Sequence, residues 1–280
     1  KRQTGKIEDY SINSAPLDFS EGKIHAIMED RDKNLWVGLF QKGIVLMPKQ
    51  ENPFEYYGNR SIYYNPIGQG CVMSIYQDSN RHLWVGADNE GIFELDAEGK
   101  RLRHYQPGNN PRSMANTIMC MYEDTNGDFW LGTYTRGLAK LNRRTGECEY
   151  PLPVDNEKIF SITEDRHKNL YIATFGSGFY RYNLVTRELK HYESSKDESG
   201  DLTRNELAND WVNYIFCDSE GMIWLGHYKG ISCFNPVNES FINYRNVNTL
   251  IEDRVGYVLQ EDHAGNTVSY THLTLPTILR

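Results

Sequence analysis

The stretch HLWVGADNEGIFELD, residues 82–96, holds two short apolar segments on either side of a polar turn. Four other segments repeat it closely: NLWVGLFQKGIVLM (34–47), DFWLGTYTRGLAKLN (128–142), NLYIATFGSGFYRYN (169–183) and MIWLGHYKGISCFN (222–235). Their aromatic residues recur at intervals of 48, 46, 41 and 53 residues, at Trp36, Trp84, Trp130, Tyr171 and Trp224. Units of about 40–50 residues with several short strands are typical of β-propeller blades. The sequence therefore predicts an all-β propeller built from four-stranded blades.

Four strands are expected in every repeat. The first strand ends just before a polar turn (IHAIMED, VMSIYQD, IMCMYED, FSITED and VNYIFCD), and the second carries the repeated aromatic. The third strand follows a glycine, at Gly43, Gly91, Gly137, Gly178 and Gly230. The fourth ends on a tyrosine, at Tyr57, Tyr105, Tyr150, Tyr192 and Tyr244. Strands of this length bounded by Gly, Asn and Asp give five complete blades, and no segment shows a helical period.

Residue size along the first strand indicates how the blades pack. The position ten residues before the repeated aromatic is small in four repeats, at Ala26, Ser74, Cys120 and Ser161, and is tyrosine in the fifth, at Tyr214. The next position is always apolar and is expected in the core, at Ile27, Ile75, Met121, Ile162 and Ile215. We expect the repeated aromatic to pack between neighbouring blades, with the glycine two residues later allowing close backbone approach.

Both ends of the sequence look cut. TGKIEDY, residues 4–10, matches the fourth strand of a preceding blade, and VGYVLQEDHAGN, residues 255–266, matches the start of a further one. The pattern then calls for Leu-Trp-Val-Gly, but the chain reads TVSYTHLTLPTILR. We therefore predict a partial propeller over residues 1–266, with a piece of a blade at each end, and a non-native tail over residues 267–280.

Composition excludes several classes of protein. The chain has 280 residues and a net charge of −8 without a block of Lys and Arg, so direct nucleic-acid binding is not expected. No apolar run is long enough to span a membrane, so no membrane contact by this fragment is expected. The five cysteines form no metal-ligand spacing and are expected to be buried free thiols within strands: Cys71, Cys120, Cys148, Cys217 and Cys233.

The segment YEDTNGDFWLGTYTRGLAKLN, residues 122–142, resembles the repeat of the two-component regulator propeller family. That repeat has an apolar strand, Glu-Asp, a Gly-Asn turn, Leu-Trp-[Ile/Val]-Gly-Thr and a Gly-Gly-Leu start to the third strand. The similarity recurs across residues 24–266, although Tyr171 replaces the tryptophan and a single glycine precedes each third strand.

The resemblance implies the periplasmic sensor region of a hybrid two-component system from a Gram-negative bacterium, anchored in the inner membrane. In such proteins two seven-bladed propellers precede a transmembrane helix and a histidine kinase that starts a phosphorelay, and they typically sense oligosaccharides. The resemblance thus implies that this chain is a fragment of a seven-bladed propeller. The chain shows no kinase phospho-acceptor context and no nucleotide-binding glycine motif, so it is expected to be non-catalytic and to need no cofactor.

Topology places a ligand site independently of the resemblance. The loop that enters the first strand and the loop after the second strand share one end of each blade. The entering loops vary most, as in residues 52–70 and 194–211, and variable loops on a rigid scaffold often bind ligands. The predicted ligand-binding residues are His25, Phe40, Asp88, Tyr134, Arg136, Phe160, Phe175, Asn213, Tyr228, Lys229 and Tyr257.

Three interpretations of these residues remain open. Aromatic faces among polar groups suit the rings of an oligosaccharide, and Arg136 and Lys229 suit an acidic sugar or another anion. The aromatics could instead pack loop against loop, or form the face of a homodimer of the parent receptor or of another protein interaction. A propeller lyase or hydrolase acting on glycans is the enzymatic alternative, with His25 and Asp88 as the candidate pair.

A metal site is not expected. Each repeat has an aspartate six residues before its aromatic, at Asp30, Asp78, Asp124, Asp165 and Asp218. DTNGD, residues 124–128, looks like the start of a calcium loop, but the other copies lack the six or so oxygen ligands that calcium needs. The repeated aspartate is therefore expected to cap the tight turn.

Overall fold

The computed structural model describes residues 24–31, 33, 35–39, 43–47, 65–154, 157–195, 205–244, 258–261, 267–270 and 277–279. All regular structure in this described part is β-strand. The chain divides into two compact units, Lys1–Asn65 and Pro66–Arg280. In the first unit, one antiparallel sheet in sequence order, blade A, contains β1 (Ile24–Glu29), β2 (Leu35–Leu39) and β3 (Gly43–Met47). The predicted fourth strand ending at Tyr57, and the predicted strand before Tyr10, lie outside the described residues.

The second unit contains four complete blades of four antiparallel strands in sequence order. Blade B comprises β4 (Val72–Gln77), β5 (Leu83–Ala87), β6 (Gly91–Leu95) and β7 (Arg101–Tyr105). Blade C comprises β8 (Ile118–Glu123), β9 (Phe129–Thr133), β10 (Leu138–Leu141) and β11 (Cys148–Glu149). Blade D comprises β12 (Ile159–Glu164), β13 (Asn169–Thr174), β14 (Phe179–Asn183) and β15 (Leu189–Tyr192). Blade E comprises β16 (Val212–Cys217), β17 (Ile223–His227), β18 (Gly230–Asn235) and β19 (Ser240–Tyr244).

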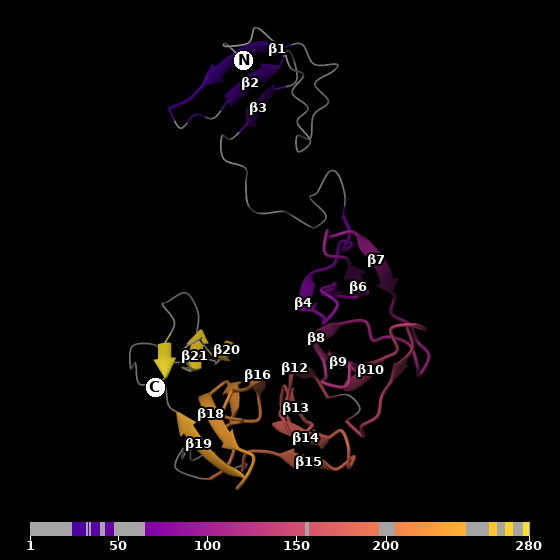
Figure 1. Cartoon of the computed structure of the whole chain (residues 1–280), viewed down its shortest axis with the longest axis vertical. Coiled ribbons are helices and arrows are strands. Elements are labelled where there is room, and N and C mark those ends of the chain that lie inside the picture. Colours follow the sequence, from indigo (N-terminus) through magenta and orange to yellow (C-terminus); the bar gives the residue numbers. More distant parts are fainter. Residues whose placement is uncertain are drawn as a thin grey trace. The chain divides into compact units, whose positions relative to one another are not determined.

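A last three-stranded sheet, blade F, contains β20 (Val258–Glu261), β21 (Thr267–Tyr270) and β22 (Thr277–Leu279). Within the second unit the first strands of successive blades lie beside one another, from β4 to β8, β12, β16 and β20 (Figure 1). The predicted all-β architecture of propeller blades is therefore confirmed. The division at residue 266 stays a prediction, although β21 and β22 pair with β20 across it.

The repeated aromatic packs between blades, as the sequence predicted. Trp84 is fully buried, and its ring lies 4.5 Å from that of Phe129 in blade C. Trp130 and Tyr171 are buried in the same way, each in a cluster with residues of the blade that follows. The glycine two residues later is also explained, because a Cβ on Gly132 would lie 2.3 Å from the sulfur of Cys120 and 2.8 Å from Ile159. The boundaries between blades B and C, C and D, and D and E are thus closely packed apolar interfaces.

The predicted core position in the first strand is right in three blades and wrong in two. Met121, Ile162 and Ile215 are buried against the preceding blade, whereas Ile27 and Ile75 are 60% and 66% exposed. The difference has a physical reason, because this side chain is covered by the preceding blade and not by its own sheet. No preceding blade of the same unit is described for either residue, since Ile75 lies in the first blade of its unit and Ile27 lies in blade A.

The cysteine prediction also needs a correction. All five cysteines are free thiols; Cys148 and Cys233 are buried inside strands, and Cys120 and Cys217 lie in strands but are only partly buried. Cys71, however, is exposed and precedes β4. It belongs to the loop that enters the strand and not to the strand itself, so no sheet covers it.

The turn between the first and second strands of each blade marks what we call the turn end of the blade. In blade C, Asp124 Oδ1 accepts the backbone N–H groups of Asn126 and Asp128, both at 2.9 Å, and Oδ2 accepts the indole N–H of Trp130 at 2.8 Å. The aspartates of blades B, D and E have the same three kinds of bond, with the Tyr171 hydroxyl donating to Asp165 in blade D. The predicted turn cap is therefore confirmed, and the same carboxylate also fixes the buried aromatic.

A second repeated contact at the turn end joins each blade to the next. Glu123, at the end of β8, accepts the backbone N–H of Ser79 in blade B at 2.7 Å. Glu164 accepts the backbone N–H of Thr125 in blade C at 2.8 Å, and Glu261 accepts that of Ser219 in blade E at the same distance. At the boundary between blades D and E the equivalent residue is Cys217, and Arg166 instead donates to the Glu220 carbonyl at 2.8 Å.

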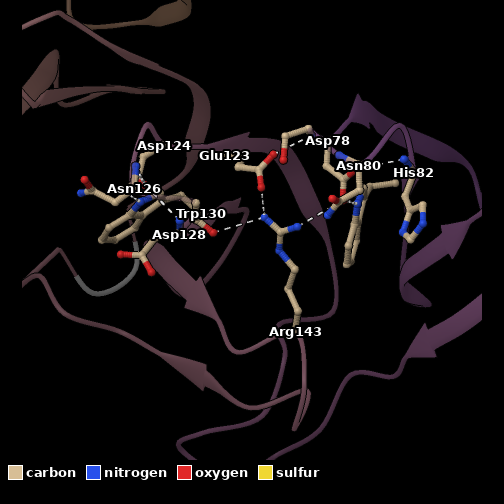
Figure 2. A network of polar contacts seen from close by, with 12 residues as sticks. Asp78, Asn80, His82, Glu123, Asp124, Asn126, Asp128, Trp130 and Arg143 are labelled. Atoms are coloured by element: carbon tan, nitrogen blue, oxygen red, sulfur yellow. Dashed lines mark hydrogen bonds and ion pairs between the residues drawn. The ribbon is translucent and has the colours of Figure 1, made fainter.

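Arg143 reinforces the boundary between blades B and C (Figure 2). Its guanidinium donates to Asp78 at 3.1 Å and to Glu123, and its charge lies over the Phe129 ring at 4.6 Å. Burial raises the pKa of Glu123, but the hydrogen bonds from Ser79 and Arg143 outweigh it and leave this pKa below its ordinary value. An open cavity of about 600 Å³ lies here, but its main cation is already paired with two carboxylates. We therefore assign this region to the scaffold.

Candidate functional site

The opposite end of each blade, which we call the loop end, holds the loop entering the first strand and the loop after the second strand. Every first strand of blades A to E contains a β-bulge beside this end, where the register against the second strand shifts. The extra residue is the one eleven positions before the repeated aromatic, at His25, Met73, Met119, Phe160 and Asn213. A bulge redirects a side chain and is common beside functional sites. Three residues predicted for ligand binding, His25, Phe160 and Asn213, are therefore bulge residues.

At the loop end of the second unit, one side-chain contact joins the neighbouring blades at each of three successive boundaries. Between blades B and C, the Thr117 hydroxyl donates to Asp88 at 2.6 Å. Between blades C and D, the Lys158 ammonium lies 5.0 Å from the Tyr134 ring centroid. Between blades D and E, the rings of Phe175 and Trp211 meet edge to face at 4.4 Å. The same two repeat positions thus form a polar pair, a cation–aromatic pair and an aromatic pair at successive boundaries.

The boundary between blades D and E carries a cluster of four aromatic rings. Phe160 stacks on Phe175 with ring centroids 4.8 Å apart, and Tyr228 lies 6.0 Å from Phe175 and 5.7 Å from Trp211. Trp211 and Tyr228 remain 46% and 48% exposed. We call Phe160, Phe175, Trp211 and Tyr228 the aromatic cluster. The structure therefore brings together three of the predicted ligand-binding residues and adds Trp211.

Trp211 and Lys158 are the loop-end residues that the sequence analysis missed. Both lie thirteen residues before the repeated aromatic, at the position that holds Cys71 in blade B and Thr117 in blade C. Because this position varies in chemistry and ends loops of different length, it does not stand out in a comparison of repeats. The sequence could have identified this position only by its spacing, since it lies two residues before the bulge residue in each of blades B to E.

Backbone contacts hold the aromatic cluster in place. The Asp210 carbonyl accepts the N–H groups of Gly176 and Gly178 at 3.1 and 2.9 Å, and Phe175 forms a β-bridge with Trp211. The Trp211 N–H donates to the Asn209 side chain at 3.0 Å. The loop after β13 and the strand entering blade E are thus one hydrogen-bonded unit, so Trp211 is presented on an ordered backbone although it is exposed.

Asn213 has an unusual polar atom. Its amide nitrogen Nδ2 is buried and has no hydrogen-bond partner among the described residues. Buried polar groups without partners are rare and cost free energy, so each calls for an explanation such as a bound ligand or water. Asn213 follows Trp211 by two residues and occupies the bulge equivalent to that of Phe160.

Two charged residues of the predicted site already form hydrogen bonds with other residues of the chain. Asp88 accepts hydrogen bonds from Thr117 and from Asn89, the latter at 3.2 Å. Arg136 donates to the carbonyls of Ser113 and Pro111 at 2.8 and 2.7 Å, and its guanidinium lies 4.1 Å from the Tyr150 ring centroid. Arg136 therefore holds the loop that enters blade C.

Lys158 and Lys229 behave differently, since neither forms an ion pair with any residue in the described part of the chain. Lys158 contacts both neighbouring boundaries. Its ammonium lies over the Tyr134 ring, and its backbone carbonyl accepts the Phe175 N–H at 2.9 Å. Lys229 follows Tyr228 in the two-residue turn between β17 and β18 and is exposed. Lys229 thus adjoins the aromatic cluster in the chain, and the Lys158 ammonium lies at the neighbouring boundary, over the Tyr134 ring.

The buried side chain of His227 holds the turn between β17 and β18 by a hydrogen bond. Its Nδ1 accepts the Lys229 backbone N–H at 3.2 Å, so Nε2 carries the proton and donates to the Ser232 hydroxyl at 2.8 Å. Ser232 in turn donates to Asn243. Burial, with a smaller contribution from the Lys229 charge, lowers the pKa of His227 to about 3. The buried imidazole is therefore neutral and serves as a structural support.

The repeat pattern is broken most often at this same boundary. Tyr171 and Ala173 replace tryptophan and glycine in blade D, and Tyr214, Cys217 and His227 replace a small residue, a Glu or Gln, and a smaller residue in blade E. The loop of residues 194–211 is also among the longest that enter a blade. Departures from local rules in an otherwise regular fold concentrate at functional sites. The boundary between blades D and E is therefore the candidate functional site.

The remaining predicted residues are placed only in part. Phe40 and Tyr257 lie outside the described residues, and for His25 only the backbone in β1 is described. Tyr134 is 41% exposed, one boundary away from the aromatic cluster. In the described residues no group of His, Cys, Asp and Glu side chains is arranged to hold a metal ion, and no helix there could cross a membrane.

Solved structures with a similar fold include sensor proteins and an enzyme. The extracellular domains of the putative hybrid two-component systems BT3049 and BT4673 from B. thetaiotaomicron align with TM-scores of 0.63 and 0.60 at 17% and 20% identity. The alignments cover 97% and 89% of this chain, but only 42% and 34% of those chains. Inactive virginiamycin B lyase from Staphylococcus aureus aligns at 0.56 with 13% identity, over 89% of this chain and 77% of the lyase. At these identities the likeness shows the β-propeller fold and nothing further.

Curated protein sequences contain no match to the chain. The sequence model of the family described as two component regulator propeller matches residues 18–41, 66–89 and 113–135. Each matched segment contains a first strand, the aspartate turn and the repeated tryptophan, which are the parts that build the turn end. The chain therefore carries two-component regulator propeller repeats at three positions.

Proposed function

We propose that this chain is part of the extracytoplasmic, periplasmic sensor region of a hybrid two-component system, and that it recognises an oligosaccharide. The observation that carries the proposal is the aromatic cluster, in which Trp211 and Tyr228 are about half exposed at the loop end, whereas the turn end repeats its aspartate cap in each of blades B to E. The propeller repeats and the likeness to extracellular sensor domains support it. The signal would pass to a histidine kinase outside this chain.

Aromatic rings with exposed faces suit sugars, because pyranose rings offer apolar C–H faces while their hydroxyl groups need polar partners. The cluster provides such faces in Trp211 and Tyr228, and the loop end provides polar groups in Asn213 and Lys229. For signalling, the ligand must bind one receptor geometry more tightly than another. A site that joins two blades meets this need, since closing on a ligand would change the blade boundary.

A calorimetric and thermal-shift screen of neutral and acidic oligosaccharides against the full chain tests the proposal. We expect at least one oligosaccharide to bind and raise the melting temperature. Failure of every chemically diverse glycan to bind would contradict the saccharide part of the proposal. The sequence that follows in the parent gene tests the other part, since a transmembrane segment and a histidine kinase are expected there.

The chain is proposed to be non-catalytic. The enzymatic alternative depends on His25 and Asp88, and Asp88 is hydrogen-bonded to Thr117 and Asn89. A reducing-end assay on the oligosaccharides that bind decides between the two. Turnover that is lost in His25→Ala would replace the sensor by a lyase or hydrolase.

A further inference from the structure

We infer that the site between blades D and E selects an acidic saccharide, one whose sugar ring stacks on Trp211 and Tyr228 and whose carboxylate binds Lys229, with Lys158 adding positive charge from the neighbouring boundary. The inference rests on the proposed function and adds the chemical class of the ligand and the residues that read it. It is carried by the chemistry of the groups at this boundary, which are exposed aromatic faces and hydrogen-bond donors.

The charged side chains at this boundary differ in whether they already have partners. Among the charged side chains predicted for the site, Asp88 and Arg136 already form hydrogen bonds with residues of neighbouring loops. Lys158 and Lys229 make no ion pair within the described residues, although the chain as a whole is acidic, with a net charge of −8. A lysine without an ion pair next to Tyr228, and a second one at the neighbouring boundary, favour a ligand that carries negative charge.

The acidic residues that precede blade E already have hydrogen-bond partners. Asp210 accepts the backbone N–H of Ser194 at 2.6 Å, and Glu206 accepts the hydroxyl of Ser195 at 2.6 Å. Both carboxylates thus have partners among the described residues that precede blade E. The two lysines, by contrast, have ammonium groups for which the described residues provide no carboxylate.

Asn213 has a hydrogen-bond donor that lacks an acceptor among the described residues. This donor is its buried amide nitrogen, and Asn213 lies in the bulge two residues after Trp211. A carboxylate or ring oxygen is the acceptor that such a group lacks. Asn213 is therefore a buried donor, close to Trp211 in the chain, that still calls for an acceptor, and a ligand rich in acceptors would supply one.

The experiment titrates the full chain by calorimetry with trigalacturonic acid, trimannuronic acid and a hyaluronan tetrasaccharide. Each is paired with its fully methyl-esterified form, which keeps the rings and removes the charge. Maltotriose and cellotriose serve as neutral sugars. We expect at least one uronate to bind, its ester to bind about tenfold more weakly or worse, and added salt to weaken the uronate but not the ester.

The variants locate the site. Trp211→Ala should weaken the uronate and its ester alike by about tenfold or more, whereas Trp211→Phe should retain most of the affinity. The double substitution Lys158→Ala and Lys229→Ala should bring the uronate to the affinity of its ester. Lys100→Ala, an exposed lysine between β6 and β7 at the turn end, is the matched control and should change nothing.

The outcomes separate this inference from the proposed function. If the neutral sugars or esters bind as tightly as the uronates, the acidic class is wrong and an oligosaccharide sensor stands. If a uronate binds but Trp211→Ala leaves its affinity unchanged, the site is wrong. If no saccharide in the set binds, the inference and the saccharide part of the proposed function both fall.

Discussion

The two ends of the blades use similar side chains for different purposes. At the turn end, Trp84 and Trp130 are buried and donate to an aspartate of their own blade, and a glutamate of the next blade caps the turn. At the loop end, Trp211 is 46% exposed and has aromatic neighbours that occur at one boundary only among the described blades. Repetition of a contact thus marks the scaffold, and its variation marks the place where a ligand is expected.

The largest expected effect lies at the turn end. Trp84→Ala removes a fully buried indole that packs against blade C, and we expect a loss of about 3–5 kcal/mol in the free energy of unfolding. Urea denaturation followed by circular dichroism measures it. A loss below about 1 kcal/mol would mean that the blade boundary does not depend on this residue.

The aspartates of one turn offer a matched pair. Asp124→Ala removes the acceptor of two backbone N–H groups and of the Trp130 indole, so we expect a loss of about 3 kcal/mol. Asp128→Ala breaks only a partly exposed ion pair with Lys140 and should cost less than about 1 kcal/mol. Equal losses in the two variants would show that the cap has no special role.

The buried imidazole in blade E predicts a dependence on pH. Because the pKa of His227 is about 3 in the folded chain and about 6.5 when unfolded, only the unfolded chain takes up a proton between these values. Stability is therefore unaffected above pH 7 and falls as the pH drops below 6.5, by about 2 kcal/mol at pH 5. His227→Gln should remove this part of the decline. Unfolding midpoints of both proteins at pH 7.5 and 5.0 give the comparison, and identical pH slopes would refute the assignment.

The smallest expected effect on stability belongs to Trp211. Since its side chain is half exposed and covers no blade core, Trp211→Ala should change the free energy of unfolding by less than about 1 kcal/mol. The contrast with Trp84→Ala is the test, because both changes remove the same side chain. A loss at Trp211 as large as that at Trp84 would assign the aromatic cluster to the scaffold.

The parts of the molecule that could be predicted from sequence are those that every blade must repeat. The position of Trp84 between blades and the role of Asp124 follow from spacing alone, because the aromatic residue and the aspartate recur at the same positions in five repeats. Ile75 was placed wrongly because its burial depends on a neighbouring blade and not on its own strand. Trp211 was missed because it ends a loop of variable length, where no repeat fixes the register.

Tyr171 shows how the two kinds of information meet. In the sequence, Tyr171 departs from the tryptophan pattern, and the spacing does not explain why a tyrosine is accepted there. The structure shows that its hydroxyl donates to Asp165 at 2.9 Å, as the indole does in other blades, so the essential property of the position is a large ring that ends in a donor. The spacing gives the position, but only the coordinates identify the acceptor.

Hydrogen exchange of the full chain, with and without the tightest-binding uronate of the set, tests the division between the two ends most directly. The account predicts slower exchange in the segments around residues 175–178, 210–213 and 227–229, with no change in the turns at residues 78–82 and 124–128. Slower exchange at those turns, with the loop end unchanged, would contradict it.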